Sequence, residues 1–232
     1  MTAQPPARLR ADARRNRDQI LAAAKAVFAE QGPDVAMEEI ARRSGVGVGT
    51  LYRRFPDRDA LIRAVARENF GTVLDEARAA TAEEPTAWGA LVRLMGRSRE
   101  LRLSVRLAVL SPSTWAAIRD DPETGRLRDG IMAVLDDLVR GAQAEGALRP
   151  DVGTGDVAAL LSLLLRRVPA DSDEMADLIL ERALVLILDG LRAVPSTTLP
   201  GTTLPGAALP GTTLPGTTLP GRPVTARDIG LG

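Results

Sequence analysis

Cysteine and histidine are both absent from the 232-residue sequence, and aromatic residues make up only 3% of it. The absence of cysteine excludes disulfides, thiol nucleophiles and thiolate metal sites. The absence of histidine removes the commonest general base and the commonest metal ligand. Carboxylates, hydroxyls, arginines and a single lysine, Lys25, remain for chemistry. We therefore expect a protein that is not an enzyme, with no catalytic residues, no cofactor and no metal site.

Long apolar segments are absent as well. The first residues, MTAQPPARLRADARRNRD, lack the apolar region of a signal peptide. The longest apolar run, from Ala183 to Leu188, is far too short to span a bilayer. These features predict a cytoplasmic protein with no membrane partner.

The net charge is zero, but the charges are unevenly distributed along the chain. Residues 1–63 contain 12 Arg or Lys and 8 Asp or Glu, whereas the remainder contains 18 and 22. A basic N-terminal part on an acidic body is typical of a protein in which only that part meets an anionic polymer.

The N-terminal part shows helical periodicity from Asn16 onward. Apolar residues repeat at the 3.6-residue period of a helix and predict its buried face. They are Ile20, Leu21, Ala24, Val27 and Phe28. The segment 32–34, Gly-Pro-Asp, is expected to end this helix. Residues 1–13 have no such periodicity, and we expect them to form a flexible basic arm.

A second, short helix is predicted by Met37, Ile40 and Ala41, which share one face. Gly45 suits the left-handed position that ends such a helix. The segment 45–49, Gly-Val-Gly-Val-Gly, resembles part of a dinucleotide-binding loop. That interpretation needs a preceding strand and a long following helix, and the pattern predicts neither.

A third short helix is predicted over residues 48–55, and Pro56 breaks it. Asp57 can cap a fourth helix, whose apolar residues begin at Leu61. A helix, a tight glycine-bearing turn and a second short helix form a helix-turn-helix arrangement. In that arrangement the second of the two helices lies in the DNA major groove.

The rest of the chain also has helical patterns, and no stretch alternates with the two-residue period of a strand. With so few aromatics, a core of Leu, Val, Ile and Ala suits helices packed on helices. We expect helices near 86–108, 113–119, 124–145, 154–167 and 173–192. The last two are apolar on nearly every side. They form either a dimer interface, which we favour, or the central helices of a monomer.

The C-terminal tail has a repetitive composition. Residues 197–221 are five tandem pentapeptides, TTLPG, TTLPG, AALPG, TTLPG and TTLPG. Proline and glycine every five residues forbid regular helix and central strand. We expect residues 195–232 to be disordered; the alternative is a segment that docks a partner protein.

Residues 15–63 resemble the N-terminal domain of the TetR family of bacterial transcriptional regulators. The motif residues appear in the family's order and with its spacing over about 50 residues of this sequence. They are Ile20, Ala24, Phe28, Gly32, Ile40, Ala41, Gly45, Val46, Gly49, Thr50, Leu51, Tyr52, Phe55 and Leu61.

The resemblance implies an all-α fold in two domains. A three-helix, helix-turn-helix DNA-binding domain over residues 14–63 would be followed by a helical ligand-binding and dimerisation domain over residues 64–194. It also implies a homodimeric bacterial repressor that binds a palindromic, double-stranded DNA operator. An unknown small-molecule effector would release the operator.

The resemblance also implies DNA contacts. Thr50, Tyr52 and Arg54 would contact phosphates, and Arg58 would hold a phosphate with the N-terminus of the fourth helix. Base-edge contacts would come from Gly47, Val48 and Arg53. Arginines near the arm would reach the DNA backbone or a minor groove. They are Arg14, Arg15 and Arg17. For every arginine the alternative is a solvated surface charge.

Two positions depart from the family pattern. Ala36 stands where Thr or Ser usually precedes the second helix, so Asp34 would have to act as its cap. Gly47 stands where Ser usually opens the third helix. A glycine cap costs only a few tenths of a kcal/mol, but it removes a hydroxyl that would contact phosphate.

The effector site is expected between the helical segments 86–108 and 124–145. Its candidate residues are Trp88, Met95 and Trp115, for which the alternative is ordinary packing. The competing function is a helical protein-interaction adaptor without sequence-specific DNA binding.

Overall fold

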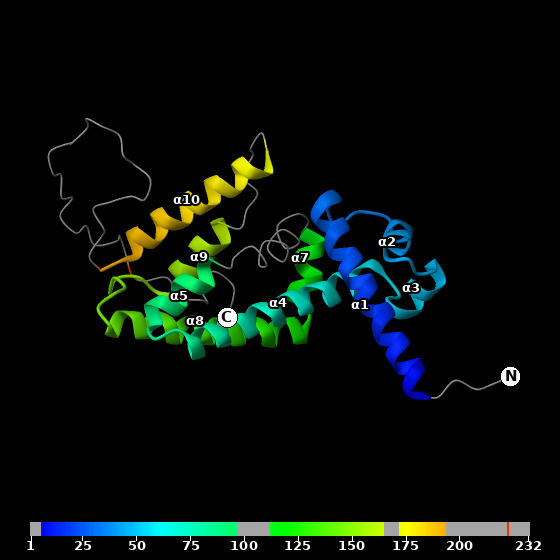
Figure 1. The fold of residues 1–232 in the computed structure, drawn as a ribbon, viewed down its shortest axis with the longest axis horizontal. Helices are drawn as coiled ribbons and strands as arrows, with labels where there is room; N and C mark the ends of the chain where they lie inside the picture. The colour runs from blue at the N-terminus through cyan, green and yellow to red at the C-terminus, as the bar shows by residue number, and fades with distance from the viewer. Residues whose placement is uncertain (1–5, 97–111, 165–171, 194–221, 223–232) are drawn as a thin grey trace. The chain divides into compact units, whose positions relative to one another are not determined.

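A computed structural model of the chain describes residues 6–96, 112–164, 172–193 and Arg222. Helices make up most of these residues, and no strand is found among them, which confirms the all-α prediction (Figure 1). In chain order the helices are α1 (Pro6–Gln31), α2 (Met37–Ser44), α3 (Val48–Arg54), α4 (Arg58–Glu83), α5 (Ala87–Gly96), α7 (Pro112–Arg119), α8 (Pro122–Ala144), α9 (Thr154–Leu164) and α10 (Asp173–Leu191).

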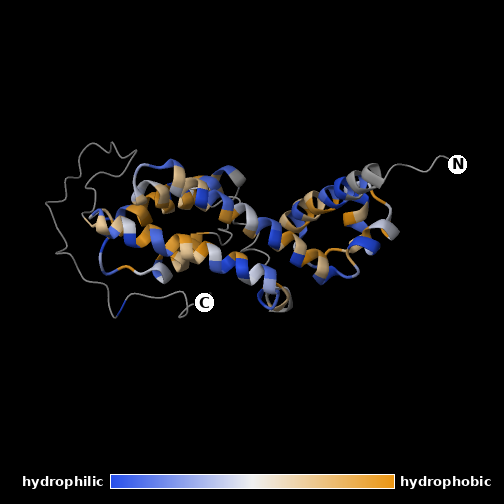
Figure 2. Ribbon diagram, turned by 90° about the horizontal axis from the view of Figure 1, so that it is seen from below, coloured by the Kyte–Doolittle hydropathy of each residue, from blue (hydrophilic) through white to orange (hydrophobic). Residues whose placement is uncertain are grey.

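The described residues divide into two compact units, each with its own core. The first comprises residues 6–74 and 112–128, and the second comprises all the other described residues. The helices α4 and α8 contribute residues to both units. In each unit, apolar residues gather on the faces that the helices turn toward one another (Figure 2). No helix in the described ranges is long and apolar enough to cross a membrane.

The core of the first unit is built from the residues that the periodicity placed on the buried faces. Fully buried large side chains come from each of the first four helices, and burying each one contributes about 1.5–3 kcal/mol. They are Ile20, Leu21, Phe28, Ile40, Leu51, Leu61 and Ile62. Ile118 of α7 joins the same core, so this unit extends beyond the predicted range of residues 14–63.

The start of α1 corrects one expectation. The helix begins at Pro6, so residues 6–13 are helical rather than a flexible arm. Proline is tolerated in the first turn of a helix, and the alanines and arginines that follow are good helix formers. The sequence of this segment has no apolar stripe, and a search for apolar periodicity therefore misses it.

The turn between α2 and α3 depends on Gly45. This residue ends α2 with φ 69° and ψ 17°, in the left-handed region that favours glycine, as predicted. The Val46 N–H donates back to the Ala41 carbonyl at 3.2 Å and closes the turn. At the other end of α2 the N-cap is Ala36, which has no side-chain hydrogen bond, so Asp34 is not the cap.

In the second unit, the residue that follows α8, Glu145, caps the start of α5. The Glu145 carboxylate accepts hydrogen bonds from the backbone N–H groups of Ala87 at 2.6 Å and Trp88 at 3.1 Å. It therefore satisfies donors that a helix N-terminus leaves unpaired. A Cβ added at Gly141 would lie 2.7 Å from the Cβ of Ala87, so α5 approaches α8 closely at this glycine.

Helices α9 and α10 lie within the ranges predicted for them, although residues 165–171 are outside the described part. Two backbone hydrogen bonds join the segment after α8 to the end of α10. The Arg149 N–H donates to the Leu191 carbonyl and the Ala193 N–H donates to the Ala147 carbonyl, both at 3.0 Å. Four large apolar side chains on α9 and α10 are exposed. They are Leu163, Met175, Leu178 and Leu186. Apart from Arg222, the predicted tail, with all five of its repeats, falls outside the described residues.

Asp121 links the start of α8 to α4 within the first unit. Its carboxylate accepts hydrogen bonds from the N–H and hydroxyl of Thr124, at 2.9 and 2.7 Å, and so caps the helix that opens with Pro122. Arg67 of α4 donates to the same carboxylate through Nε at 2.8 Å and through its Nη2. The Arg67 guanidinium, assisted by Thr124, holds the pKa of the Asp121 carboxyl well below its usual value against the opposing effect of burial.

Replacing Gly45 tests the turn. Gly45→Ala should lower the free energy of unfolding by about 1–2 kcal/mol, because a residue with a Cβ is strained in the left-handed region. Gly49→Ala is the matched control, since Gly49 lies inside α3 and an added Cβ there meets nothing within 4 Å. It should raise the free energy of unfolding by about 0.5–1 kcal/mol. Denaturant titrations measure both, and a Gly45→Ala variant as stable as Gly49→Ala would contradict the turn assignment.

The Asp121 carboxylate should make stability depend on pH. Its pKa is lowered in the folded state, so its contribution is present above the unfolded value of about 4 and is lost as pH falls through the folded pKa. Asp121→Asn keeps a cap but loses the ion pair, and should cost about 1 kcal/mol at neutral pH; Asp121→Ala should cost about 2 kcal/mol.

Both differences should shrink when the denaturant titrations are repeated in acid. Asp120→Asn is the control, because Asp120 forms an exposed pair with its neighbour Arg119. If Asp121→Asn and Asp120→Asn behave alike at neutral pH, the role assigned to the Arg67 pair is wrong.

Candidate nucleic-acid interface

Helix α3 has seven residues and buries one of them. Leu51 is 0% exposed and enters the core of the first unit. The N-cap Gly47 is exposed, and the side chains of Val48 and Tyr52 are 41% and 40% exposed. A helix this short is not stable by itself, so its position is set by Leu51 and the adjoining turn. The rest of its surface is available to a partner.

The charges on α3 are of one sign. Arg53 and Arg54 occupy its last turn, and the helix has no acidic residue. On α2, by contrast, Arg42 pairs with Glu39 at 2.6 Å, and this interaction lowers the pKa of the Glu39 carboxyl. Arg42 is thus paired within its own helix, whereas the two arginines of α3 have no acidic residue in the same helix.

Two flanks of α3 carry different side chains. On the flank beside α2, the Tyr52 hydroxyl donates to Glu38 Oε1 at 3.4 Å. Val48 precedes Tyr52 by four residues and shares that flank. Thr50, Arg53 and Arg54 are three and four residues apart and lie together on the flank beside α1.

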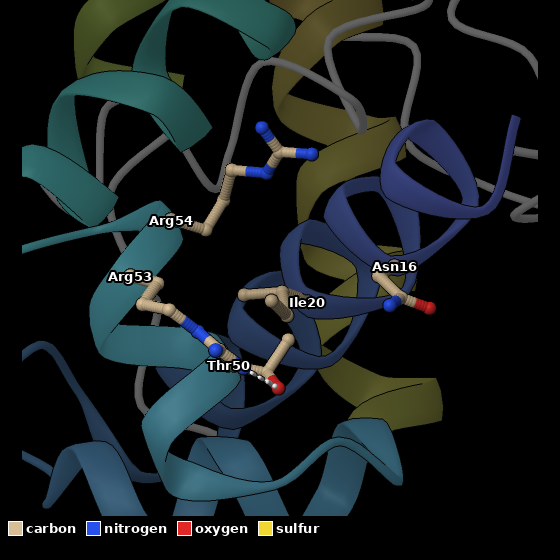
Figure 3. A pocket seen from close by; sticks show the side chains of 5 residues that line it. All are labelled: Asn16, Ile20, Thr50, Arg53 and Arg54. Atoms are coloured by element: carbon tan, nitrogen blue, oxygen red, sulfur yellow. Dashed lines mark hydrogen bonds between the residues drawn. The ribbon is translucent and has the colours of Figure 1, made fainter. Parts of the chain in front are cut away.

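A hollow of about 210 Å³ lies between this second flank and α1 (Figure 3). It is lined by Thr50, Arg53 and Arg54 of α3 and by Asn16 and Ile20 of α1. Arg53 Nη2 donates to Thr50 Oγ1 at 3.1 Å, and Arg54 extends in another direction (Figure 3). Sequence reasoning missed Asn16, although it lies four residues before Ile20 and so shares a face of α1 with it.

Arg58 is the first residue of α4. Its guanidinium lies 3.7 Å from the carboxylate of Asp34, which is itself highly exposed. Asp57 caps the helix as predicted, because its Oδ1 accepts from the Ala60 N–H at 2.6 Å. One backbone donor of this N-terminus is therefore already used by the protein.

The remaining predicted contacts are spread over other elements. Arg14, Arg15 and Arg17 lie on helix α1, where the first two are exposed and the third is half-buried, and none of them lines the hollow. In the second unit, Met95 is fully buried and Trp88 is half-buried, with the Arg192 guanidinium 5.2 Å from its ring centre. The Trp115 backbone lies on α7, and its side chain is outside the described part.

This surface combines guanidinium, hydroxyl and amide groups with one exposed valine. Guanidinium groups form short, strong hydrogen bonds with phosphates, and arginine and valine can also contact guanine and the thymine methyl group. The geometry is therefore suited to a nucleic acid duplex.

Comparison with known proteins decides the family. Residues 20–65 match the family described as bacterial regulatory proteins, tetR family, and residues 102–193 match the SbtR-like transcriptional regulator C-terminal domain. A solved TetR transcription regulatory protein from Mycobacterium vanbaalenii is 35% identical, over 79% of this chain and 99% of that one, with a TM-score of 0.56. The chain belongs to the TetR family of transcriptional regulators.

Other relatives agree with this assignment. The TetR transcriptional regulator SCO0520 from Streptomyces coelicolor is 35% identical, over 76% of this chain and 98% of that one, with a TM-score of 0.55. An HTH-type transcriptional regulator from Staphylococcus aureus (strain USA300) is 43% identical over 54 residues, 23% of this chain. The chain matches 29–37% of the length of such curated relatives.

The comparisons confirm that this TetR-family chain is a transcriptional regulator and not an enzyme. The match to the tetR family, residues 20–65, includes α2, α3 and the start of α4.

Proposed function

We propose that this TetR-family protein is a repressor of the bacterial cytoplasm that binds a palindromic operator as a homodimer and releases it when a small molecule binds. The observation that carries the proposal is the surface of α3, which has two arginines, no acidic residue and a single buried anchor, Leu51. A helix held in this way can enter the major groove without disturbing its own core.

The DNA contacts are proposed to come from α3 and the residues flanking it. The set comprises Gly47, Val48, Thr50, Tyr52, Arg53, Arg54 and Arg58. All of them are exposed or half-buried. Contacts from the α1 residues Arg14, Arg15 and Arg17 are part of the same proposal. The Tyr52–Glu38 and Arg58–Asp34 interactions would have to open when phosphates approach, since both involve a carboxylate.

The exposed apolar residues of the last two helices support a homodimer. Met175, Leu178 and Leu186 of α10 recur at helical spacing, and Leu163 of α9 is also exposed. Large apolar side chains clustered on a surface mark an interaction site. A second copy of the chain would cover them, and two copies would place two α3 helices on the two halves of a palindrome.

The effector is proposed to bind in the predicted domain of residues 64–194. Both α4 and α8 contribute residues to the two compact units. A ligand that stabilises one conformation of α4 and α8 in the second unit would therefore also affect the first unit, because both helices continue into it. Trp88 is its proposed contact in the second unit, and Trp115, the other predicted contact, lies on α7 of the first unit. Met95 is already fully buried in the core of the second unit and would have to be uncovered.

Electrophoretic retardation with the DNA upstream of the protein's own gene tests operator binding. Wild-type protein should retard this fragment at low salt, and its affinity should fall steeply as the salt concentration rises. Each phosphate contact adds about −0.9 to the slope of log K plotted against log salt concentration. A protein-interaction adaptor would leave the fragment unshifted at every salt concentration, and that result would refute the proposal.

Tyr52→Ala tests the assignment of α3. The substitution should weaken operator binding by about tenfold or more, because it removes a hydroxyl and a ring from the proposed contact surface. Arg140→Ala is the control, since Arg140 is an exposed cation on α8 paired with Asp136 and Asp137. Circular dichroism should show both variants folded. Equal affinity of the two variants would show that α3 is not the recognition helix.

Leu178→Glu combined with Leu186→Glu tests the dimer. Light scattering after size exclusion should give a dimeric mass for the wild type and a monomeric mass for the double variant, because two carboxylates would be desolvated in the interface. Glu174→Gln changes an exposed polar residue of the same helix and should remain dimeric. A double variant with unchanged mass would place the interface elsewhere.

A further inference from the structure

The hollow between α1 and α3 brings together donors from two helices. Asn16 contributes an amide, Thr50 a hydroxyl and Arg53 a guanidinium group, and Arg54 also lines the hollow. No carboxylate lines the hollow. Ile20, which is fully buried, closes its inner side with apolar atoms. Hydrogen bonds to an anion are stronger beside such a wall than in open water.

The internal hydrogen bond of the hollow leaves donors for a ligand. Arg53 uses one N–H to donate to Thr50 Oγ1 at 3.1 Å, and a guanidinium has five. Thr50 accepts that bond with its oxygen, so its own hydroxyl hydrogen can still be donated. The Asn16 amide adds two further hydrogens. Asn16, Thr50 and Arg53 thus each bring a hydrogen-bond donor to the same hollow.

The direction of Arg53 distinguishes a backbone contact from a base contact. Its side chain lies along Thr50 on the flank beside α1 (Figure 3). Tyr52, which donates to Glu38, lies on the flank beside α2. A helix in the major groove has a phosphate backbone on either side and base edges ahead of it. A flank that packs beside a second helix is directed at one of those backbones.

We propose that Asn16, Thr50 and Arg53 together bind one phosphate of the DNA backbone. Asn16 then becomes a DNA contact. Arg53 contacts the backbone, whereas the family resemblance implied that it contacts a base edge. The inference rests on the proposed DNA-binding function. It goes further in naming a site, its chemistry and the residue that couples α1 to the operator.

Fluorescence anisotropy with the full-length protein tests the site. Two labelled duplexes are titrated over a salt series: the upstream fragment of the protein's own gene and an unrelated duplex of equal length. Asn16→Ala and Arg53→Ala should each weaken binding to both duplexes by a similar factor, about tenfold, and leave the ratio of the two affinities unchanged. Arg53→Ala should also reduce the salt slope by about one for each bound protomer.

Two further variants separate contact from structure. Asn16→Asp keeps the size of the side chain but places a negative charge beside the phosphate, so it should bind more weakly than Asn16→Ala while thermal unfolding stays the same. Gln19→Ala removes an exposed amide of α1 that does not line the hollow, and should bind like the wild type. In the Asn16→Ala, Arg53→Ala double variant, the loss should be smaller than the product of the two single losses.

The outcomes separate this inference from the function on which it rests. If wild-type protein binds neither duplex, the proposed function fails. If the wild type binds but Asn16→Ala behaves like Gln19→Ala, only the phosphate site is overturned. If Arg53→Ala weakens binding to the upstream fragment but leaves binding to the unrelated duplex unchanged, Arg53 contacts a base edge. The phosphate site is then overturned as well.

Discussion

The insertion of Leu51 into the core of the first unit is the interaction on which the proposed DNA-binding surface depends. Helix α3 has seven residues, too few to be stable alone, and Leu51 is the residue it buries. Its neighbours in that core come from α1, α2 and α4. The position of every exposed side chain on α3 therefore follows from how those helices pack, and a loosened core would weaken the interface without touching it.

The same constraint explains how polar groups are distributed around α3. Because Leu51 occupies the core, the other side chains of α3 lie on its two flanks. The flank beside α2 contacts Glu38, and the flank beside α1 lines the hollow. The hollow contains donors and no carboxylate, whereas the other flank contains one. An anion approaching α3 therefore meets two different environments, and only one of them must first release an internal hydrogen bond to a carboxylate.

Much of the fold could be predicted because apolar spacing is a local property. The buried apolar faces of α1 and α2 were found from their period, and Gly45 was found from the conformation that only glycine adopts easily. Two features were not found. The first ten residues of α1 are helical by propensity without an apolar stripe. Asn16 is polar and was passed over, although its spacing from Ile20 places it beside α3.

The sequence by itself determined the helical segments, their buried faces and the motif of the TetR family, because these are set by residues a few positions apart. The tertiary structure alone decided which polar groups meet. Arg67 reaches Asp121, Glu145 caps α5, and Asn16 lines the same hollow as Arg53, although the residues of each pair are tens of positions apart along the chain. Such pairs depend on how helices pack, and no local period records that packing.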